Sequence, residues 1–597
     1  MVSNIQKIKK IIDSFKTVKI KTVKNKTVKI IDSFKTVKIK KPADFSLKCS
    51  DCKLELIEDS GYLSLGICSN CGHHDVLTAK QWIQILFDPN SFNEKFINFE
   101  SPDPLHFNDS KPYKERIKSA KQNTGEQSAV TTGITSVRGK KVIAVIFNFK
   151  FMGGSMGYVV GERINSTVEN AIRNKIPLVI VTCSGGARMQ EGTLALTQMI
   201  KTTNAINKLH KAGLPLIVIL ANPTTGGVYA SFANQADILI AEEKALIGFA
   251  GPRVRAVNSD EKDRIFAEQL FDNGLIDIIL SRKNMRDYLE RVLNVISANT
   301  MNANTNMLGP KIIQSTNQGW DSVTNSRKID RPGAIDYIQA IFSDFLELRG
   351  DRNGTNDEVL IGGFAKVALK NVMVIGQNKY AGDSEITKGR VTAAGYRKAT
   401  RIISIANRLK LPIICFIDTP GANDSLDNEM QGLANAISDT IAALSNAAIE
   451  SISIIIGEGG SGGAIALCCT DQILMQENAF LAITSPEGAA SILYRDKKYA
   501  EDVANALGIT AMEHKKLGFV DEIIAEPHNG ASTNKQEAIR LVYESLINSL
   551  IKLENEESEK RIEARDRKWI NLGKNQKFSS MIQGMLLGIT RKMKVRN

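Results

Sequence analysis

Four cysteines near the N-terminus have the types and spacing of a metal site. Cys49 and Cys52 form one C-x-x-C pair, Cys68 and Cys71 form a second, and fifteen residues separate the pairs. Thiolates in this pattern can occupy the corners of a tetrahedron, as in structural zinc sites. Because four thiolates leave no open coordination position, we expect a structural Zn²⁺. Short strands at Leu54–Ile57 and Tyr62–Leu65 would complete a zinc ribbon.

Pairs of adjacent glycines are the second feature with chemical potential. Gly185-Gly186, Gly226-Gly227 and Gly462-Gly463 each follow an apolar, strand-like run. Glycine lets a main chain approach a ligand closely, and its N–H can stabilise a developing oxyanion. The alternative is that these glycines only permit tight turns between a strand and a helix.

The stretch Gly457–Gly463 also fits two other motifs. Gly457, Gly459 and Gly462 match a dinucleotide fingerprint, and Gly459-x-Ser461-x-Gly463 matches a hydrolase nucleophile elbow. The corresponding turn at 223–227 fits neither motif. None of the six histidines lies in a glycine-rich turn, which leaves a serine nucleophile without an evident base. His514 and His528 are the remaining candidates for that role.

Two long segments repeat the same order of features. The matching positions keep an offset of 234 to 236 residues over about 75 residues, and include Pro177 with Pro412, Gly226 with Gly462, Asp237 with Asp471, and Pro252 with Pro486. A stable offset of this length indicates a duplicated domain.

The elements that must position these glycines are short apolar strands alternating with helices. We expect strands at Val142–Phe149, Leu178–Cys183 and Leu216–Ala221, and helices at Glu162–Arg173 and Leu194–Lys211. This alternation predicts an α/β fold with mostly parallel strands. Ligands of such sheets gather at the carboxyl ends of the strands, where the glycine-rich turns lie.

Composition narrows the class of protein. The chain has 597 residues, of which 43% are hydrophobic and 24% charged. The longest apolar runs are strand-sized, so no membrane span is expected. No secretory signal is visible, and eight cysteines without a disulfide pattern favour a reducing cytoplasm.

The net charge of +13 is concentrated at one end of the chain. Residues 1–48 hold fourteen lysines against three aspartates, which accounts for +11. Within this segment, Lys10–Lys21 recurs unchanged as Lys29–Lys40. The repeat is typical of a solvated, low-complexity extension; a basic amphipathic helix on an anionic surface is the alternative. Because the rest of the chain is near neutral, nucleic acid is not expected as the main ligand.

The longer motifs resemble those of the carboxyltransferase of bacterial acetyl-CoA carboxylase. The first part is similar to the β subunit in its four cysteines and in three stretches, 152–157, 184–190 and 245–253. The second part is similar to the α subunit in four stretches, 395–398, 416–422, 456–464 and 485–488. The two parts, usually separate chains, are fused here with the β-like part first.

The resemblance implies two crotonase-like (ClpP/crotonase) α/β domains in tandem, preceded by the zinc ribbon. It implies transfer of a carboxyl group from carboxybiotin to acetyl-CoA, giving malonyl-CoA, the first committed step of fatty acid synthesis. It places Gly185 and Gly186 at the acyl-CoA thioester oxygen, and Gly463 and Ala464 at the biotin ureido oxygen. Gly226, Gly227 and Gly462 would also bind substrate. The proton would pass from the acetyl group to biotin, with no side-chain base.

The resemblance also implies partners. A biotin carboxyl carrier protein and a separate biotin carboxylase are expected, because no biotinyl-lysine or ATP-binding motif is evident here. An active site between the β-like part of one protomer and the α-like part of another would make the chain at least a homodimer. A propionyl-CoA-type carboxyltransferase or biotin-dependent decarboxylase subunit is the nearest alternative, and a zinc-ribbon nucleic-acid-binding protein is a second.

These inferences give the following organisation. We expect a basic low-complexity tail at 1–44, a zinc ribbon at 45–75, a β-like crotonase domain at 76–300, a linker at 301–330, an α-like crotonase domain at 331–555 and a basic C-terminal tail at 556–597.

Overall fold

The computed structural model describes residues 48–56, 60–250, 264–297, 299, 317–381 and 389–572. The repeated lysine-rich segment, Pro252 and residues 573–597 lie outside the described residues, as does most of the expected linker. The chain divides into two compact units, one ending at His73 and one beginning at His74.

The described part of the first unit contains the four cysteines and a short helix. Helix α3 spans Ser60–Leu65, so the expected strand at Tyr62–Leu65 is wrong. Gly66 ends this helix with a left-handed φ of 65°, and its N–H donates to the carbonyl oxygen of Tyr62. Four residues, three of them hydrophobic, fit one helical turn as well as a strand, so the pattern did not discriminate. In the region of the strand expected at 54–57, Glu55 forms an isolated β-bridge with Lys48 and is not part of a named strand.

The second unit begins with an eight-stranded sheet. Its order is β1-β2-β3-β4-β5-β6-β8, with β7 paired to β5. β1 to β3 are antiparallel neighbours, and the strands from β3 onward pair in parallel. The strands are β1 Asn93–Glu94, β2 Val130–Val137, β3 Lys140–Phe147, β4 Leu178–Ser184, β5 Leu216–Thr225, β6 Ile238–Glu242, β7 Ile247–Gly248 and β8 Ile278–Leu280.

A second eight-stranded sheet follows, with the same topology. Its order is β9-β10-β11-β12-β13-β14-β16, with β15 paired to β13. The strands are β9 Ser343–Glu347, β10 Leu360–Val367, β11 Lys370–Gln377, β12 Ile413–Thr419, β13 Ser451–Gly460, β14 Gln472–Gln476, β15 Phe480–Ala482 and β16 Glu522–Ile524. We call residues 74–299 the first half and residues 317–572 the second half.

The register of the two sheets confirms the duplicated domain. Leu178 of β4 pairs with Leu216 of β5, and Ile413 of β12 pairs with Ser451 of β13. Each residue of the second pair therefore lies 235 residues after its counterpart in the first pair, as the sequence offset predicts. Every residue of β4 and of β12 is buried, as expected for strands in the middle of a parallel sheet covered on both faces.

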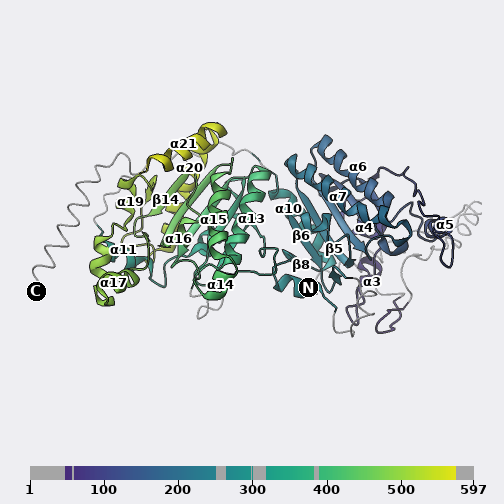
Figure 1. The fold of residues 1–597 in the computed structure, drawn as a ribbon, viewed down its shortest axis with the longest axis horizontal. Coiled ribbons are helices and arrows are strands. Elements are labelled where there is room, and N and C mark those ends of the chain that lie inside the picture. The colour runs from purple at the N-terminus through teal and green to yellow at the C-terminus, as the bar shows by residue number, and fades with distance from the viewer. Residues whose placement is uncertain are drawn as a thin grey trace, which may run out of the picture. The chain divides into compact units, whose positions relative to one another are not determined.

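Helices pack on both sheets in matching pairs (Figure 1): α6 lies on α7 in the first half, and α13 lies on α15 in the second. The expected helices at 162–173 and 194–211 fall within α6 and α7. The helices of the first half are α4 Ala79–Leu86, α5 Tyr113–Thr124, α6 Tyr158–Asn174, α7 Thr193–Lys211, α9 Ala267–Asp272 and α10 Arg282–Val295.

Within the described ranges, the second half has more helices than the first. They are α11 Gly319–Ser326, α12 Ala334–Ile341, α13 Ala393–Leu409, α14 Leu426–Met430, α15 Leu433–Ser445, α16 Ser461–Ile465, α17 Pro486–Tyr494, α18 Ala500–Ala506, α19 Ala511–Leu517, α20 Lys535–Glu554 and α21 Ser558–Asn571. Helix α21 lies in the segment expected as a basic tail, yet its Arg561 and Arg565 are buried. Among the described residues, no helix is long and apolar enough to cross a membrane.

Candidate functional site

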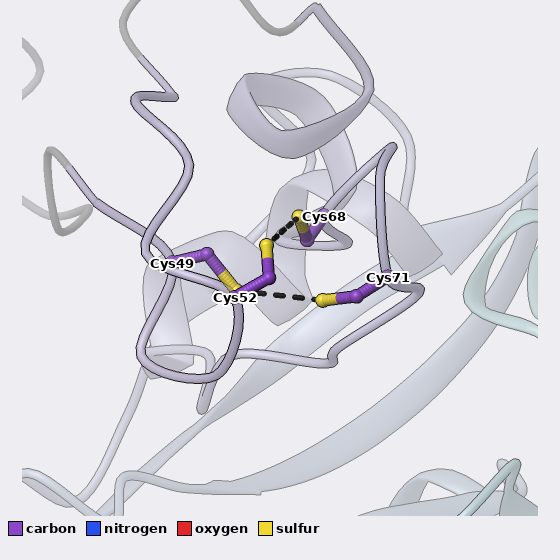
Figure 2. A group of neighbouring side chains, drawn as sticks. All are labelled: Cys49, Cys52, Cys68 and Cys71. Atoms are coloured by element: carbon purple, nitrogen blue, oxygen red, sulfur yellow. Dashed lines mark hydrogen bonds between the residues drawn. The ribbon is translucent and has the colours of Figure 1, made fainter.

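The four cysteines come together as the spacing predicts (Figure 2). All four sulfur atoms lie within 4.8 Å of one another. The Cys49 and Cys71 sulfurs are 3.6 Å apart, and so are those of Cys52 and Cys68. A tetrahedral zinc with Zn–S bonds of about 2.3 Å requires sulfurs about 3.8 Å apart. The donor set and its spacing therefore fit a closed, four-thiolate metal site.

A pocket of about 720 Å³ lies in the first half, at the carboxyl ends of β4 and β5. Gly185, directly after β4, is exposed in it, and Thr225 at the end of β5 also lines it. Gly153, from the short 3₁₀ turn after β3, completes this part of the wall. The carboxyl ends of parallel strands thus form the pocket that the sequence pattern predicts.

Close packing around the turns after β4 and β5 explains three of the first-half glycines. Gly186 has a φ of 113°, which non-glycine residues rarely adopt. A Cβ on Gly226 would lie 2.8 Å from Gly186 Cα, and a Cβ on Gly227 would lie 2.9 Å from Met199 Sδ. Gly186 and Gly226 therefore let the turn after β4 pack on the turn after β5, and Gly227 lets the turn after β5 pack on α7.

The N–H groups of Gly185 and Gly186 have partners within this structure. Gly185 donates to the carbonyl oxygen of Gly153 at 2.9 Å, and Gly186 donates to Ser184 Oγ at 3.1 Å. A substrate oxygen at this turn would have to replace one of these acceptors.

A buried polar cluster supports the same turn and was not predicted. Arg188 lines the pocket and donates to the carbonyl oxygen of Ser155 at 2.9 Å. Glu191, fully buried, accepts hydrogen bonds from Ser101, from Arg188 and from the hydroxyl of Tyr113. Burial raises the pKa of Tyr113 to about 12, so its hydroxyl stays protonated and donates. The sequence signal was Arg188 and Glu191 themselves, close behind the glycine pair.

The second half has a matching pocket of about 670 Å³ at the carboxyl ends of β12 and β13. Gly462 and Gly463 line it, opposite Gly421 and Ala422 of the turn after β12. A Cβ on Gly463 would lie 2.5 Å from the Ala422 nitrogen, whereas a Cβ on Gly462 would meet open space. Ala464 is fully buried behind this turn. The two halves therefore repeat the pocket as well as the sheet.

Two buried side chains hold the carbonyl oxygen of Gly463. Gln377 Nε2 donates to it at 2.9 Å, and Tyr396 Oη donates at 3.0 Å. Burial raises the pKa of Tyr396 well above its usual value, so the hydroxyl remains a donor. Because a trans peptide directs its N–H opposite to its C=O, these donors fix the orientation of the peptide between Gly463 and Ala464.

Cationic side chains form one wall of the second pocket. Lys379 Nζ lies 2.7 Å from Asp418 Oδ1, and Arg327 lies 2.8 Å from Glu458 and 2.7 Å from Glu487. Burial would lower the pKa of Lys379, but the Asp418 carboxylate outweighs it and the pKa rises. The lysine therefore stays charged at neutral pH. The sequence signal was its position two residues after β11.

No histidine lies among the described residues that line either pocket. His514 Nε2 is 3.0 Å from the carbonyl oxygen of Leu481, and burial lowers the pKa of this histidine. Burial also lowers the pKa of His210, which lies near Asp237. Among the described lining residues, neither pocket offers an imidazole that could act as a general base.

Comparisons with known proteins agree with this architecture. Residues 266–573 match the family described as acetyl co-enzyme A carboxylase carboxyltransferase-like. The acetyl-coenzyme A carboxylase carboxyl transferase subunits beta/alpha of Clostridium tetani are 38% identical over 531 residues, covering 85% of this chain and 90% of that protein. The protein of the same name from Salinispora tropica is 37% identical over 522 residues, covering 85% and 92%.

Solved structures confirm the expected fold of two crotonase-like domains in tandem. Transcarboxylase 12S, solved with methylmalonyl-coenzyme A and methylmalonic acid bound, gives a TM-score of 0.61 at 23% identity, covering 79% of this chain and 90% of that one. A single-chain, multi-domain long-chain acyl-CoA carboxylase gives a TM-score of 0.59 at 16% identity, covering 76% and 45%. The relatives match this chain in sequence over most of both chains. This chain therefore belongs to the acetyl-coenzyme A carboxylase carboxyl transferase family, in the form that joins the β and α subunits.

Proposed function

We propose that the chain transfers a carboxyl group from carboxybiotin on a carrier protein to acetyl-CoA, giving malonyl-CoA. The observation that carries this proposal is the pair of matching pockets at the carboxyl ends of two duplicated sheets. The reaction has two substrates of different chemistry, and each half supplies one pocket. The C–N bond of carboxybiotin breaks, a C–C bond forms at the acetyl methyl carbon, and the methyl proton passes to the biotin nitrogen.

The first-half pocket would take the acyl-CoA. Gly185 and Gly186 would face the thioester oxygen, and the packed turn at Gly226 and Gly227 would hold that loop in place. Lys111, Arg116 and Lys150 line the same pocket, and their cationic groups suit the phosphates of coenzyme A. The present acceptors of the two glycine N–H groups, Gly153 and Ser184, would give way to the substrate oxygen.

The second-half pocket would take the biotin group. Gly462 and Gly463 line the pocket, and the peptide that links Gly463 to Ala464 would face the ureido oxygen. Arg327, Lys379 and Arg390 also line this pocket. Each is paired with a carboxylate in this structure, and their cationic groups suit the carboxylate that carboxybiotin carries. No side-chain base is needed, in keeping with pockets that lack histidine among the described residues.

A homodimer or larger assembly is part of the proposal. Within one chain the halves meet near the amino ends of β6 and β8, through Asp237 and Asp277, away from the pockets. Exposed apolar residues lie beside both pockets, namely Met189 (80% exposed) and Phe249 (71%) at the first and Met430 (82%) and Ile483 (84%) at the second. Such residues suit a contact between the first half of one chain and the second half of another.

We propose Zn²⁺ at the four cysteines, a cytoplasmic location, and two partner proteins, a biotin carboxyl carrier protein and a biotin carboxylase. The nucleic-acid-binding alternative depended largely on residues 1–48, which lie almost wholly outside the described part of the chain.

The decisive experiment is product formation by the purified chain. With carrier, biotin carboxylase, ATP and bicarbonate, we expect malonyl-CoA from acetyl-CoA only when all components are present. Propionyl-CoA in a parallel reaction tests the alternative substrate class. Equal or faster carboxylation of propionyl-CoA would contradict the acetyl-CoA assignment. Absence of any carboxylated product with an active carrier would contradict the proposed function.

A further inference from the structure

Each half carries two aspartates at the amino ends of its parallel strands. In the first half, Asp237 accepts the N–H of Leu216, the first residue of β5, at 2.8 Å, and Asp277 accepts the N–H of Leu239 in β6 at 2.8 Å. These carboxylates hold the starts of adjacent strands.

The second half repeats both contacts. Asp471 accepts the N–H of Ser451, the first residue of β13, at 2.9 Å, and Asp521 accepts the N–H of Ile473 in β14 at 2.7 Å. Asp471 corresponds to Asp237 and Asp521 to Asp277 by position in the sheet. We call the surface around each aspartate pair the amino-end face of its half.

In the first half, this face is covered by the second half. Arg408 of α13 pairs with Asp237, and Arg401 of the same helix lies 2.9 Å from Asp277. Arg352, also from the second half, pairs with Asp277. Burial would raise the pKa of Asp277, yet the two guanidinium groups beside it hold that pKa below its usual value. The amino-end face of the first half is therefore one of the surfaces through which the halves are joined, alongside the contact of α10 with β9 and β10.

In the second half, the same face is covered by α21. Arg565 lies 3.2 Å from Asp471, Arg561 lies 3.4 Å from it, and Lys568 pairs with Asp521. The three cations are spaced at i, i+4 and i+7, so they share one side of the helix. Arg401 and Arg408 of α13 are likewise seven residues apart.

The turns beside the aspartates are covered in the same way. A Cβ on Gly213, in the turn after α7, would lie 3.2 Å from the carbonyl oxygen of Arg408. Ala448 holds the equivalent position after α15, and its carbonyl oxygen accepts from Arg561 at 3.1 Å. The order of contacts along α21 is the reverse of that along α13, because Arg401 meets Asp277 whereas Arg561 meets Asp471. The two helices therefore cover equivalent faces in opposite directions.

We propose that the amino-end face is a docking surface for a cationic helix, duplicated with the fold, and that α21 occupies the copy in the second half. The helix that covers the second-half face is thus a segment of the same chain. On the first-half face, the equivalent place is taken by the second half. This role is separate from the proposed transfer reaction, because the face lies at the opposite ends of the strands from the pockets.

The test uses the full-length chain with two matched double variants. Arg565→Ala/Lys568→Ala removes cations that face the aspartates, whereas Lys560→Ala/Arg567→Ala removes two exposed cations of the same helix. Hydrogen exchange reports the protection of α21, and a fluorescent peptide with the sequence of residues 557–572 reports whether the face is open. We expect protection of α21 to fall at least tenfold in the first variant only. The peptide should bind that variant, but neither the control variant nor the unaltered chain.

Further outcomes separate docking from general unfolding. A peptide carrying the substitutions of Arg565 and Lys568 to alanine should not bind, and amides of β12 and β13 should stay protected. Unchanged protection of α21 in the first variant would overturn the proposal, as would equal binding of the peptide to all three proteins. Simultaneous loss of protection in β12 and β13 would also overturn it, because α21 would then be part of the core rather than the occupant of a surface.

Discussion

The hydroxyl of Tyr396 donates a hydrogen bond to the carbonyl oxygen of Gly463, 3.0 Å away. Tyr396 lies in α13, on the same helix that carries Arg401 and Arg408 to the first half. One helix therefore supports the glycine turn of one pocket and the junction between the halves.

Tyr396→Phe should weaken the biotin-side pocket without abolishing it. The variant loses one of two donors to Gly463, which typically costs about 1 kcal/mol of stability. We expect a higher KM for a biotin substrate with an unchanged KM for malonyl-CoA in the reverse reaction. Tyr337→Phe is the control, because Tyr337 is equally buried and donates to Gln476 at 3.1 Å, away from the pocket. Equal kinetic effects of both substitutions would show that Tyr396 acts only through general stability.

The two glycine turns should be separable by mutation. A Cβ on Gly463 would lie 2.5 Å from backbone atoms, so substitution there distorts the turn itself, and Gly186 has a strained φ for any side chain. Gly185 and Gly462 have room for a side chain directed into each pocket. We expect Gly185→Val and Gly462→Val each to slow the reaction at least tenfold, or about 1.4 kcal/mol in the barrier.

The two valine variants serve as controls for each other. In the reverse direction, Gly185→Val should mainly impair the use of malonyl-CoA, and Gly462→Val the use of a biotin analogue. Steady-state kinetics with each substrate varied separately measures this. Identical effects on both substrates would contradict the assignment of one pocket to each.

Histidine substitutions should leave the chemistry intact. We expect His514→Ala and His528→Ala to retain activity within a few-fold if folded, because neither histidine lines a pocket. His514 packs against Phe519, with ring centroids 5.7 Å apart, so a moderate loss of thermal stability is expected. A folded but inactive variant would replace the proposed mechanism by side-chain acid–base catalysis.

Removing one thiolate should empty the metal site. We expect about one zinc per chain by elemental analysis, and Cys52→Ser should reduce it severalfold because a closed four-thiolate site loses a ligand. Cys469→Ser is the control, since Cys469 lies in the second half, outside the cluster. Far less than one zinc in the unaltered chain would contradict the zinc assignment.

Asp88 should stabilise the fold in a pH-dependent way. Hydrogen bonds from Ser136 and the N–H groups of Gly139 and Arg138 lower the pKa of Asp88 to about 2. Because the folded value is below the unfolded one, near 4, its contribution is complete above about pH 4 and is lost as the pH falls toward 2. Asp88→Asn should therefore flatten the acid dependence of thermal unfolding. Asp427→Asn, at an exposed carboxylate of α14, should leave it unchanged.

The sequence predicted the architecture because its signals are local and repeated. The constant offset between Pro177 and Pro412 identified the duplication, and the glycine pairs identified the carboxyl-end turns. Four residues at Tyr62–Leu65 were too few to separate a strand from a helical turn. Sequence patterns predict structure well where many positions show the same spacing or polarity.

The contacts that join the halves were beyond such reasoning. Arg408 and Asp237 are 171 residues apart, and no local pattern pairs them. Residues 558–571 have the composition of a solvated charged segment, and only the tertiary structure shows that Arg565 faces a buried carboxylate. The contact of Tyr113 with Glu191, 78 residues apart, was hidden for the same reason.

The duplicated amino-end face also bears on how the chain avoids unlimited growth. The contact between the halves is heterologous, because it joins two different surfaces, and heterologous contacts that do not close into a ring extend into filaments. A tandem repeat with an open copy of such a face would offer every chain a site for the next one. Since α21 covers Asp471 and Asp521, the second-half face cannot accept a further half from another chain. Contacts between chains must therefore use other surfaces.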